Sequence, residues 1–289
     1  MKKYKRYQEK LKNLESQQKY DVDVNYGEYK FVKQQEPNHR YIYNRFIDKV
    51  YYVFLRFVVL IFAPILLFFT YRLRIKGRKN LKKRGKTGGI AISNHVALLD
   101  SLITKQTIFT KAYFIGAEHN NKRGFGGYTI KLLGFLPLSS QFSNQKNLDS
   151  AITYYTSQGK LVCLNPEQAM WRGYTKLRPF KNGAFYYAVK NNVPIIPIVN
   201  LIRKANWWDK LWGRHFKITT QVLPPVYANN DLPTKQRIED LKTRSRDSMI
   251  KVMNDFYGTE CDVIKIDKVN KIQEESISTN VTTESTDTK

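Results

Sequence analysis

The chain has 289 residues, of which 42% are hydrophobic, and its 49 Lys and Arg against 24 Asp and Glu give a formal net charge of +25. The hydrophobic content, with 19 Tyr and 16 Phe, is enough for a packed core and excludes wholesale disorder. Two cysteines are too few for a disulfide framework, and the charge favours a polyanionic partner: nucleic acid, an anionic bilayer or an acidic carrier protein.

Residues 1–49 are predicted to form a basic N-terminal arm rich in tyrosine. Tyr4, Tyr7, Leu11 and Leu14 are spaced so that they fall on one stripe of a short amphipathic helix. The pattern fits an interfacial helix and a loosely ordered arm equally well. Because no early apolar run is followed by small residues, we expect no cleavable signal peptide.

Residues 50–76 are predicted to form a membrane-inserted segment. As a straight helix, its apolar run Val50–Tyr71 would rise about 33 Å, enough to cross a bilayer core of roughly 30 Å. Arg56 interrupts the run, Pro64 lies where it would bend a helix, and basic residues flank both ends. Since cytoplasmic loops carry the positive charge, both ends are best placed on the cytoplasmic side. We therefore expect a bent or shallow insertion into one leaflet, with Arg56 reaching the headgroups; a single span is the closer alternative and a buried core helix the more distant one.

Residues 77–258 show short apolar runs that alternate with amphipathic stretches. Strands are expected at 89–93, 112–115, 161–164 and 193–199, and helices at 101–110, 148–157, 183–190 and 231–257. This alternation predicts an α/β fold with a central, mainly parallel or mixed sheet flanked by helices. The polar sequence of residues 259–289 predicts a disordered tail.

The segment after the first of these strands carries the residues best suited to chemistry. His95 lies where the strand ends, and Asp100 is expected about one turn into the following helix. By spacing alone, a surface His and a helix-capping Asp would be the more common explanation. A carboxylate that holds one imidazole nitrogen, however, leaves the other nitrogen free to act as a general base. Because the chain has no Gly-x-Ser-x-Gly nucleophile, the attacking hydroxyl would come from the substrate.

Four sequence blocks give this His–Asp pair its context. They are Asn94–Asp100, Gly134–Ser139, Leu164–Arg172 and Val193–Ile198, with Phe180–Ala184 between the last two. In this order, over roughly residues 75–225, they resemble the glycerophospholipid acyltransferase family of the lysophosphatidic acid acyltransferase (1-acyl-sn-glycerol-3-phosphate acyltransferase) type. The resemblance implies that residues 77–258 form an acyltransferase domain.

The resemblance also implies a reaction and roles for individual residues. A fatty acyl group would pass from a thioester donor to a lysophospholipid hydroxyl, by default that of 1-acyl-glycerol-3-phosphate, without a covalent acyl-enzyme. His95 would deprotonate the acceptor, Asp100 would orient His95, and Glu167 would either bind substrate hydroxyls or shape its loop. Further substrate-binding roles are expected for Asn94, Arg172, Arg178 and Lys181.

Two departures from the family pattern leave the acceptor open. The second block usually carries an Arg for the acceptor phosphate, whereas Leu138–Ser140 supplies none. The third block usually reads Pro-Glu-Gly-Thr-Arg, whereas here Pro166–Met170 reads Pro-Glu-Gln-Ala-Met. Because Arg binds phosphate bidentately, its place would be taken by Arg172, Arg178 or Lys181, or the acceptor is a glycolipid or another lysolipid.

Other segments carry weaker signals. Gly124–Gly127 lacks a following Lys and Ser or Thr, so it predicts a mobile loop at the substrate mouth rather than a nucleotide site. Three tryptophans beside basic residues fit a membrane interface or a loop packed on the core: Trp207, Trp208 and Trp212. The remaining histidines lack zinc-ligand spacing, so we expect no metal and no cofactor, with acyl-CoA or an acyl-[acyl carrier protein] as co-substrate: His39, His119 and His215.

Two other classes of protein were weighed against an enzyme. A nucleic-acid-binding protein would explain the charge but neither the apolar segment nor the four blocks, and no nucleic-acid motif is present. A non-catalytic basic membrane-binding scaffold would not need both His95 and Asp100. We therefore expect an O-acyltransferase of membrane lipid synthesis, with membrane lipids as partners, on the cytoplasmic face of the cell membrane.

Overall fold

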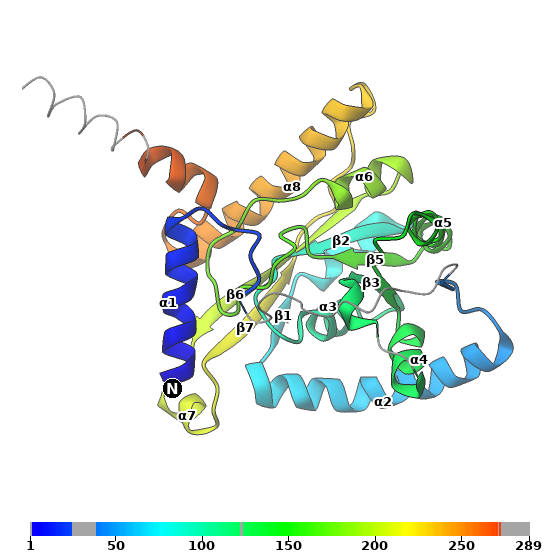
Figure 1. Ribbon diagram of the computed structural model, residues 1–289, viewed down its shortest axis with the longest axis horizontal. Coiled ribbons are helices and arrows are strands. Elements are labelled where there is room, and N and C mark those ends of the chain that lie inside the picture. Colours follow the sequence, from blue (N-terminus) through cyan, green and yellow to red (C-terminus); the bar gives the residue numbers. More distant parts are fainter. Residues whose placement is uncertain (1, 25–38, 122–123, 271, 273–289) are drawn as a thin grey trace, which may run out of the picture.

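The structure, a computed structural model, describes residues 2–24, 39–121, 124–270 and 272. Within these residues a seven-stranded sheet forms the centre of the molecule, in the order β1-β7-β6-β2-β5-β3-β4 (Figure 1). Its strands are β1 (Arg74–Lys76), β2 (Gly89–Ser93), β3 (Ala112–Gly116), β4 (Phe135–Pro137), β5 (Leu161–Leu164), β6 (Ile195–Lys204) and β7 (Phe216–Val222). Strands β6 and β7 pair antiparallel, and the other neighbours pair in parallel. The predicted α/β class with a mainly parallel, mixed sheet is confirmed.

Helices cover both faces of the sheet. They are α1 (Lys2–Ser16), α2 (Phe46–Tyr71), α3 (Asp100–Ile108), α4 (Gly124–Leu132), α5 (Phe142–Ser157), α6 (Gly183–Lys190), α7 (Trp207–Leu211) and α8 (Thr234–Tyr257), with short 3-10 turns η1 (Arg78–Arg84) and η2 (Glu118–Asn120). Along β2, Ile90 and Ile92 pack with α5, α6 and α8, whereas Ala91 packs with Ile108 of α3 on the opposite face. A parallel strand buried on both faces reads as a continuous apolar run, which explains why β2 was found from sequence.

Three strands and two helices, α4 and α7, were not predicted. Strands β1, β4 and β7 escaped prediction, and two of them have only three residues. The glycine-rich stretch at 124–127, expected as a mobile loop, instead begins helix α4. Gly has low helix propensity, so the local sequence argued against a helix there, and the helix packs on α2 and β4.

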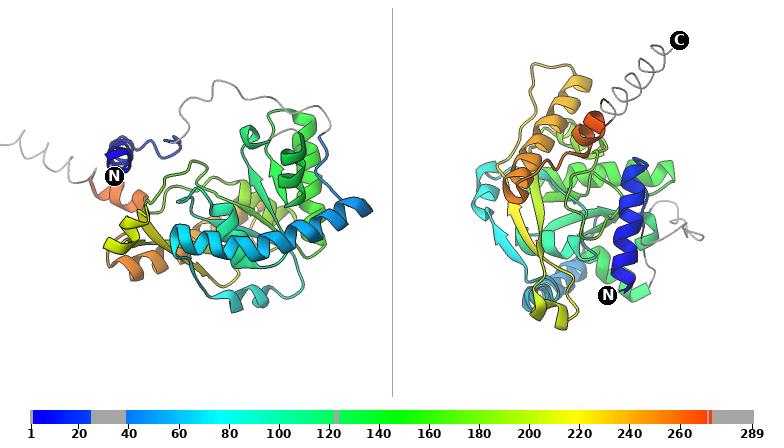
Figure 2. Two further views of the ribbon diagram at one scale, coloured as in Figure 1. Left: turned by 90° about the horizontal axis from the view of Figure 1, so that it is seen from below. Right: turned by 90° about the vertical axis from the view of Figure 1, so that its left-hand side faces the viewer.

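Helix α2 is the apolar segment predicted from sequence, and it is long and apolar enough to cross a membrane. It lies lengthwise across the underside of the molecule (Figures 1 and 2). Near its start, Asp48 is 2% exposed and accepts hydrogen bonds from Arg40 and from Tyr128 of α4. Near its end, Leu67 and Tyr71 are buried in the cluster that also contains residues of α3 and β7. The buried core helix considered from sequence is excluded, because only 11% of the apolar window is buried.

The outer face of α2 is a continuous set of exposed apolar side chains. It comprises Phe46, Ile47, Val50, Val53, Phe54, Phe57, Ile61, Phe62, Ile65, Leu66, Phe68 and Phe69. Arg56 does not point away with them: its guanidinium donates to the hydroxyl of Tyr52 and to the carbonyl of Phe109 at the end of α3. The guanidinium is thus turned away from the apolar face, and a carbonyl at a helix C-terminus is a favourable partner for a cation; that Arg56 reaches the headgroups stays a prediction.

Helix α1 places the predicted apolar stripe against the protein itself. Leu11 is buried with Tyr20, Trp171, Tyr174 and Val263, and Tyr7 and Leu14 pack against this cluster. The stripe thus forms an amphipathic helix, but its apolar face is covered by the chain's own domain rather than by a bilayer. The rest of the predicted arm includes residues 25–38, which lie outside the described residues.

The disordered tail was predicted to start at residue 259, but the folded part of the chain continues beyond that residue. Residues 263–270 are helical, and Cys261, Asp262 and Val263 are buried. Asp262 forms two hydrogen bonds of 2.7 Å with the guanidinium of Arg246 on α8. The segment was misjudged because its three buried residues are too few to give a sequence pattern. The prediction for residues 273–289 lies outside the described residues.

Candidate active site

The loop between β2 and α3 brings His95 and Asp100 together. Asp100 is the first residue of α3 rather than one turn into it, so its carboxylate turns back over the loop. Oδ2 lies 2.7 Å from Nδ1 of His95 and accepts the N–H groups of Val96 and Ala97 at 2.8 and 2.9 Å. A carboxylate at a helix N-terminus also has a favourable position in the field of the helix dipole.

This geometry sets the protonation pattern that a general base needs. An ionised carboxylate only accepts hydrogen bonds, so the Nδ1 atom of His95 carries the proton that it donates to Asp100. Nε2 is then the unprotonated ring nitrogen. The side chain of Asp100 is 2% exposed and that of His95 is 25% exposed, so the carboxylate is shielded while the imidazole is open to a substrate.

The backbone of His95 is held as firmly as its ring. Its N–H donates to Oε2 of Glu167 at 2.8 Å, and its carbonyl accepts the N–H of Trp171 at 3.0 Å. Glu167 follows β5, the strand that pairs with β2. Neighbouring parallel strands end at the same edge of the sheet, and this brings the third sequence block onto the first.

Glu167 and Arg178 form a buried ion pair behind this backbone. Each side chain is 1% exposed, and Oε2 of Glu167 lies 2.8 Å from Nη2 of Arg178. Oε1 of Glu167 accepts the N–H of Arg178, and the guanidinium also donates to the carbonyls of Tyr20 and Ala169. Of the two roles considered for Glu167, the contacts support shaping the loop. The guanidinium of Arg178 is buried and bound to protein atoms, which indicates a structural role, and the substrate-binding role expected for it stays a prediction.

Asn94 is also structural. It is fully buried, its Nδ2 donates to the carbonyl of Asn200 on β6, and its Oδ1 accepts the N–H of Asn200. The side chain of Asn200 in turn donates to Oδ1 of Asp100 at 3.4 Å. Asn94 therefore joins the ends of β2 and β6, and the substrate-binding role expected for it stays a prediction.

Arg172 and Lys181 lie outside this network. The guanidinium carbon of Arg172 lies 5.9 Å from the ring centre of Tyr4 and 5.8 Å from that of Phe216. Lys181 is half exposed and its ammonium lies 3.9 Å from a carboxylate oxygen of Asp21. Among the described residues, the network around His95 thus gathers Asp100, Glu167 and Arg178 but neither of these two cations.

A further carboxylate, which was not predicted from the sequence, lies at the same edge of the sheet. Glu118 follows β3, and its Oε2 accepts the N–H of Ser140, which follows β4, at 3.3 Å. The hydroxyls of Ser139 and Ser140 lie 3.5 and 3.4 Å from the same carboxylate. The only signal in the sequence was a charged residue directly after a buried strand. The second block therefore carries a hydroxyl–carboxylate cluster at the place where the family pattern has an Arg.

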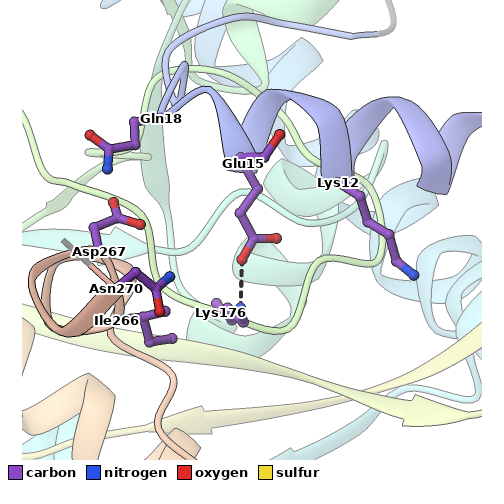
Figure 3. Close-up of a pocket in the computed structure, with 8 residues that line it drawn as sticks. Lys12, Glu15, Gln18, Lys176, Ile266, Asp267 and Asn270 are labelled. Carbon is purple, nitrogen blue, oxygen red and sulfur yellow. Dashed lines mark hydrogen bonds and ion pairs between the residues drawn. The ribbon is translucent and has the colours of Figure 1, made fainter. Parts of the chain in front are cut away.

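Helix α1 and the segment after it contact the third block, Leu164–Arg172. These contacts were not predicted from the sequence either. The N–H of Arg172 donates to the hydroxyl of Tyr7 at 2.7 Å, and the indole N–H of Trp171 donates to the carbonyl of Val22 at 2.8 Å. Between α1 and residues 266–270 lies a cavity of about 490 Å³, crossed by the ion pair of Glu15 and Lys176 (Figure 3). His95 is not among the residues that line this cavity.

Comparisons with known proteins agree with the sequence blocks. Residues 72–200 match the family model described as Acyltransferase. A 1-acyl-sn-glycerol-3-phosphate acyltransferase of Saccharomyces cerevisiae is 26% identical over 191 residues, which are 63% of this chain and 60% of that protein. The 1-acyl-sn-glycerol-3-phosphate acyltransferase alpha of Homo sapiens is 26% identical over 179 residues, 58% of this chain and 59% of that protein.

The chain thus spans about three fifths of the length of the curated relatives it matches. A crystal structure of the 1-acyl-sn-glycerophosphate (LPA) acyltransferase PlsC from Thermotoga maritima aligns with a TM-score of 0.47 and 18% identity, over 70% of this chain and 80% of that one. The matched region, residues 72–200, contains the hydrogen-bonded His95–Asp100 pair and its Glu167–Arg178 support. Residues 72–200 are thus similar to the Acyltransferase family model, and the curated relatives that the chain resembles are 1-acyl-sn-glycerol-3-phosphate acyltransferases.

Proposed function

We propose that this protein is a membrane-surface O-acyltransferase that moves a fatty acyl group from a thioester donor to the hydroxyl of a lysophospholipid, by default 1-acyl-glycerol-3-phosphate. The observation that carries the proposal is the His95–Asp100 pair, joined at 2.7 Å inside the region that matches the Acyltransferase family model. The relatives named as 1-acyl-sn-glycerol-3-phosphate acyltransferases support the choice of acceptor.

The reaction needs one base and no enzyme nucleophile. Nε2 of His95 takes the proton of the acceptor hydroxyl as its oxygen attacks the thioester carbonyl. The tetrahedral intermediate collapses with cleavage of the C–S bond, and the imidazolium returns the proton to the departing thiolate. Asp100 stabilises the imidazolium between these steps and keeps the ring in the correct tautomer. The donor is acyl-CoA or an acyl-[acyl carrier protein], and the +25 charge favours either of these acidic molecules.

The membrane part of the proposal rests on α2 and α7. Both ends of α2 are tied to the domain, and its apolar face is open along its length, as expected for a helix that lies in one leaflet. Trp207, Trp208 and Trp212 are 62%, 54% and 69% exposed, which excludes the alternative that they pack on the core. Tryptophan beside basic residues is typical of the bilayer interface. The basic flanks of α2 favour the cytoplasmic face of the cell membrane.

A glycolipid or another lysolipid with a neutral headgroup is the second candidate acceptor. The hydroxyls of Ser139 and Ser140 and the carboxylate of Glu118 stand where the family pattern has an Arg. A cluster of acceptors and neutral donors suits hydroxyl groups better than it suits a phosphate.

The catalytic proposal is tested with purified full-length protein, one thioester donor, and three acceptors: lysophosphatidic acid, lysophosphatidylglycerol and a diacylglycerol glycolipid. His95→Ala should lower turnover with the preferred acceptor by about 10²-fold or more, because the base is lost. Asp100→Asn should also impair turnover, because an amide in place of the carboxylate favours the wrong tautomer. His39→Ala is the matched control and should leave the rate within about twofold. Near-normal turnover by a folded His95→Ala protein would contradict the role of His95 as the general base. A preference for the glycolipid over lysophosphatidic acid would identify the second candidate as the acceptor.

A further inference from the structure

A second cavity lies beside α2 and α7, and neither His95 nor Asp100 is among the residues that line it. Its volume is about 370 Å³, and it is lined by Phe69, Thr70 and Tyr71 at the end of α2, by Trp212, Gly213, Arg214, His215 and Phe216 between α7 and β7, and by Arg172. Its lining has two arginines and no carboxylate. A hollow of this composition is suited to an anion held beside apolar groups.

Arg172 is the cation of this cavity that lacks a counter-charge. Its guanidinium carbon lies 5.9 Å from the ring centre of Tyr4 and 5.8 Å from that of Phe216, and within the described part of the chain it forms no ion pair with a carboxylate. Its Nε atom is buried, and no described residue accepts a hydrogen bond from it. The backbone of Arg172 is fixed by Tyr7 and Gln8 of α1. The side chain is therefore positioned by aromatic rings and a rigid backbone, with N–H donors available to a ligand.

The surroundings add positive charge. Arg214, which lines the cavity, and its neighbours Arg72 and Lys217 all lie within 3.5 Å of the buried carboxylate of Asp209. Three cations against one carboxylate leave a net positive charge. The ring of His215 stacks on Tyr4 at 4.2 Å, and burial together with the charge of Arg172 lowers its pKa. His215 and Arg172 both line the cavity.

The position of the cavity relates it to the bilayer. The end of α2 and helix α7 lie on the same side of the molecule in each view (Figures 1 and 2). On the α2 side, Phe68 and Phe69 are more than half exposed, and on the α7 side, Leu211 and Trp212 are each 69% exposed. Apolar side chains that flank a cationic hollow match the transition from acyl chains to headgroups.

We propose that this cavity binds the phosphate group of a membrane glycerophospholipid, with Arg172 as the principal donor and the acyl chains lying along Phe69 and Trp212. The cavity is a lipid site additional to the acceptor site at His95. It fixes the height of the domain relative to the headgroups, so that His95 faces the bilayer surface in a constant position. This site does not depend on which lipid the enzyme acylates.

The test follows the histidine side chains by NMR in the full chain, held in neutral detergent and labelled at His Cε1, with assignment by His215→Gln and His95→Gln. The probe is dihexanoylphosphatidic acid, with dihexanoylglycerol and inorganic phosphate as comparison ligands. The His215 resonance should shift saturably with the phosphatidic acid and not with dihexanoylglycerol. Inorganic phosphate should need at least tenfold higher concentration, because it gains nothing from the apolar flanks.

Two variants remove the same charge from the same side of the molecule. Arg172→Gln should weaken the His215 response at least tenfold, whereas Lys210→Gln, at an exposed position of α7 that does not line the cavity, should change it less than twofold. Arg172→Lys, which keeps the charge, should bind more tightly than Arg172→Gln, and thermal unfolding shows that each variant is folded.

Several outcomes would overturn the proposal: unchanged binding by Arg172→Gln, equal loss in Lys210→Gln, or equal affinity for inorganic phosphate and the lipid. The His95 resonance reports the acceptor site in the same spectrum. Because a phosphatidic acid is also the product of the proposed reaction, a His95 resonance that shifts and saturates at the same concentrations as that of His215 would place the ligand in the acceptor site and would also overturn the proposal.

Discussion

At the scale of single residues, the candidate site depends on buried polar groups that satisfy one another. Oδ2 of Asp100 accepts three hydrogen bonds, and the carboxylate of Glu167 accepts from the backbone of His95 and from Arg178. The contacts of Oδ2 of Asp100 stay within its own loop, whereas Glu167 reaches the backbone N–H of His95 from a distant part of the sequence. The orientation of the His95 ring is therefore a property of the folded domain and not of the loop alone.

Glu167→Gln tests this support. The substitution leaves the guanidinium of Arg178 buried without its counter-charge, and breaking a buried pair in this way costs about 3–5 kcal/mol. Urea unfolding should show a loss of that order in the free energy of unfolding. Glu239→Gln, which removes a half-exposed partner of Lys242, is the control and should cost about 0–1 kcal/mol. Equal, small losses in both variants would show that the Glu167–Arg178 pair does not hold the loop.

One residue of the third block is held in an unfavourable backbone conformation. Gln168 has a φ of 62°, in the left-handed region that favours glycine. The family pattern has glycine at this position, so the chain keeps the turn although it lacks the residue that best fits it. The turn persists because Glu167 is fixed on one side and the carbonyl of Ala169 binds Arg178 on the other.

At the scale of elements, α2 differs from a core helix, because most of its exposed side chains are apolar and only a few of its residues are buried against the domain. Removing residues 1–76 would be an unclear test of membrane binding, since this deletion also removes α1, which supports the third block through Tyr7 and Leu11. Substitutions on the outward face leave these contacts in place.

The triple substitution of Phe54, Phe57 and Ile61 by Glu should release the protein from vesicles at high salt. These side chains are 60%, 63% and 43% exposed on α2, and burying one such side chain contributes about 1.5–3 kcal/mol, so their loss removes several kcal/mol. High salt screens the remaining attraction of the basic surface. Sedimentation with anionic vesicles in 0.5 M salt measures the change. Retention equal to wild type would contradict the insertion of α2, and labelling that finds residues 39–45 and His95 on opposite sides would contradict the one-leaflet arrangement.

At the scale of the whole molecule, the two ends of the described chain pack against each other. The hydroxyl of Tyr20 donates to Asp267, and Leu11 of α1 and Val263 share one cluster with Trp171. Residues outside the matched region 72–200 thus brace the third block from two directions.

Ending the chain after Gly258 should therefore lower the melting temperature substantially. The truncation removes Asp262 and leaves Arg246, a buried residue of α8, without its carboxylate, and such a loss costs about 3–5 kcal/mol. This is a large part of the roughly 5–15 kcal/mol that stabilises a typical domain. A chain ended after residue 272 keeps these contacts and is the control. Equal melting temperatures for the two truncations would show that residues 259–270 do not brace the domain.

The sequence by itself determined the α/β class, the apolar segment and the His95–Asp100 pair. These are local features: strands buried on both faces read as short apolar runs, and the His and Asp are five positions apart on one loop. The sequence could not determine which distant residues meet. Asn94 and Arg178 were expected at the substrate, but the sheet order buries them against Asn200 and Glu167.

Only the tertiary structure decided the surroundings of the pair. Strand β5 lies next to β2, which brings Glu167 to the backbone of His95, and α1 fixes the backbone of Arg172 beside α2 and α7. The physical reason is that these contacts join residues more than 70 positions apart, through hydrogen bonds whose partners depend on strand order and on the packing of helices. Composition and periodicity determine which face of an element is buried, whereas the partner of that face is fixed only when the whole chain has folded.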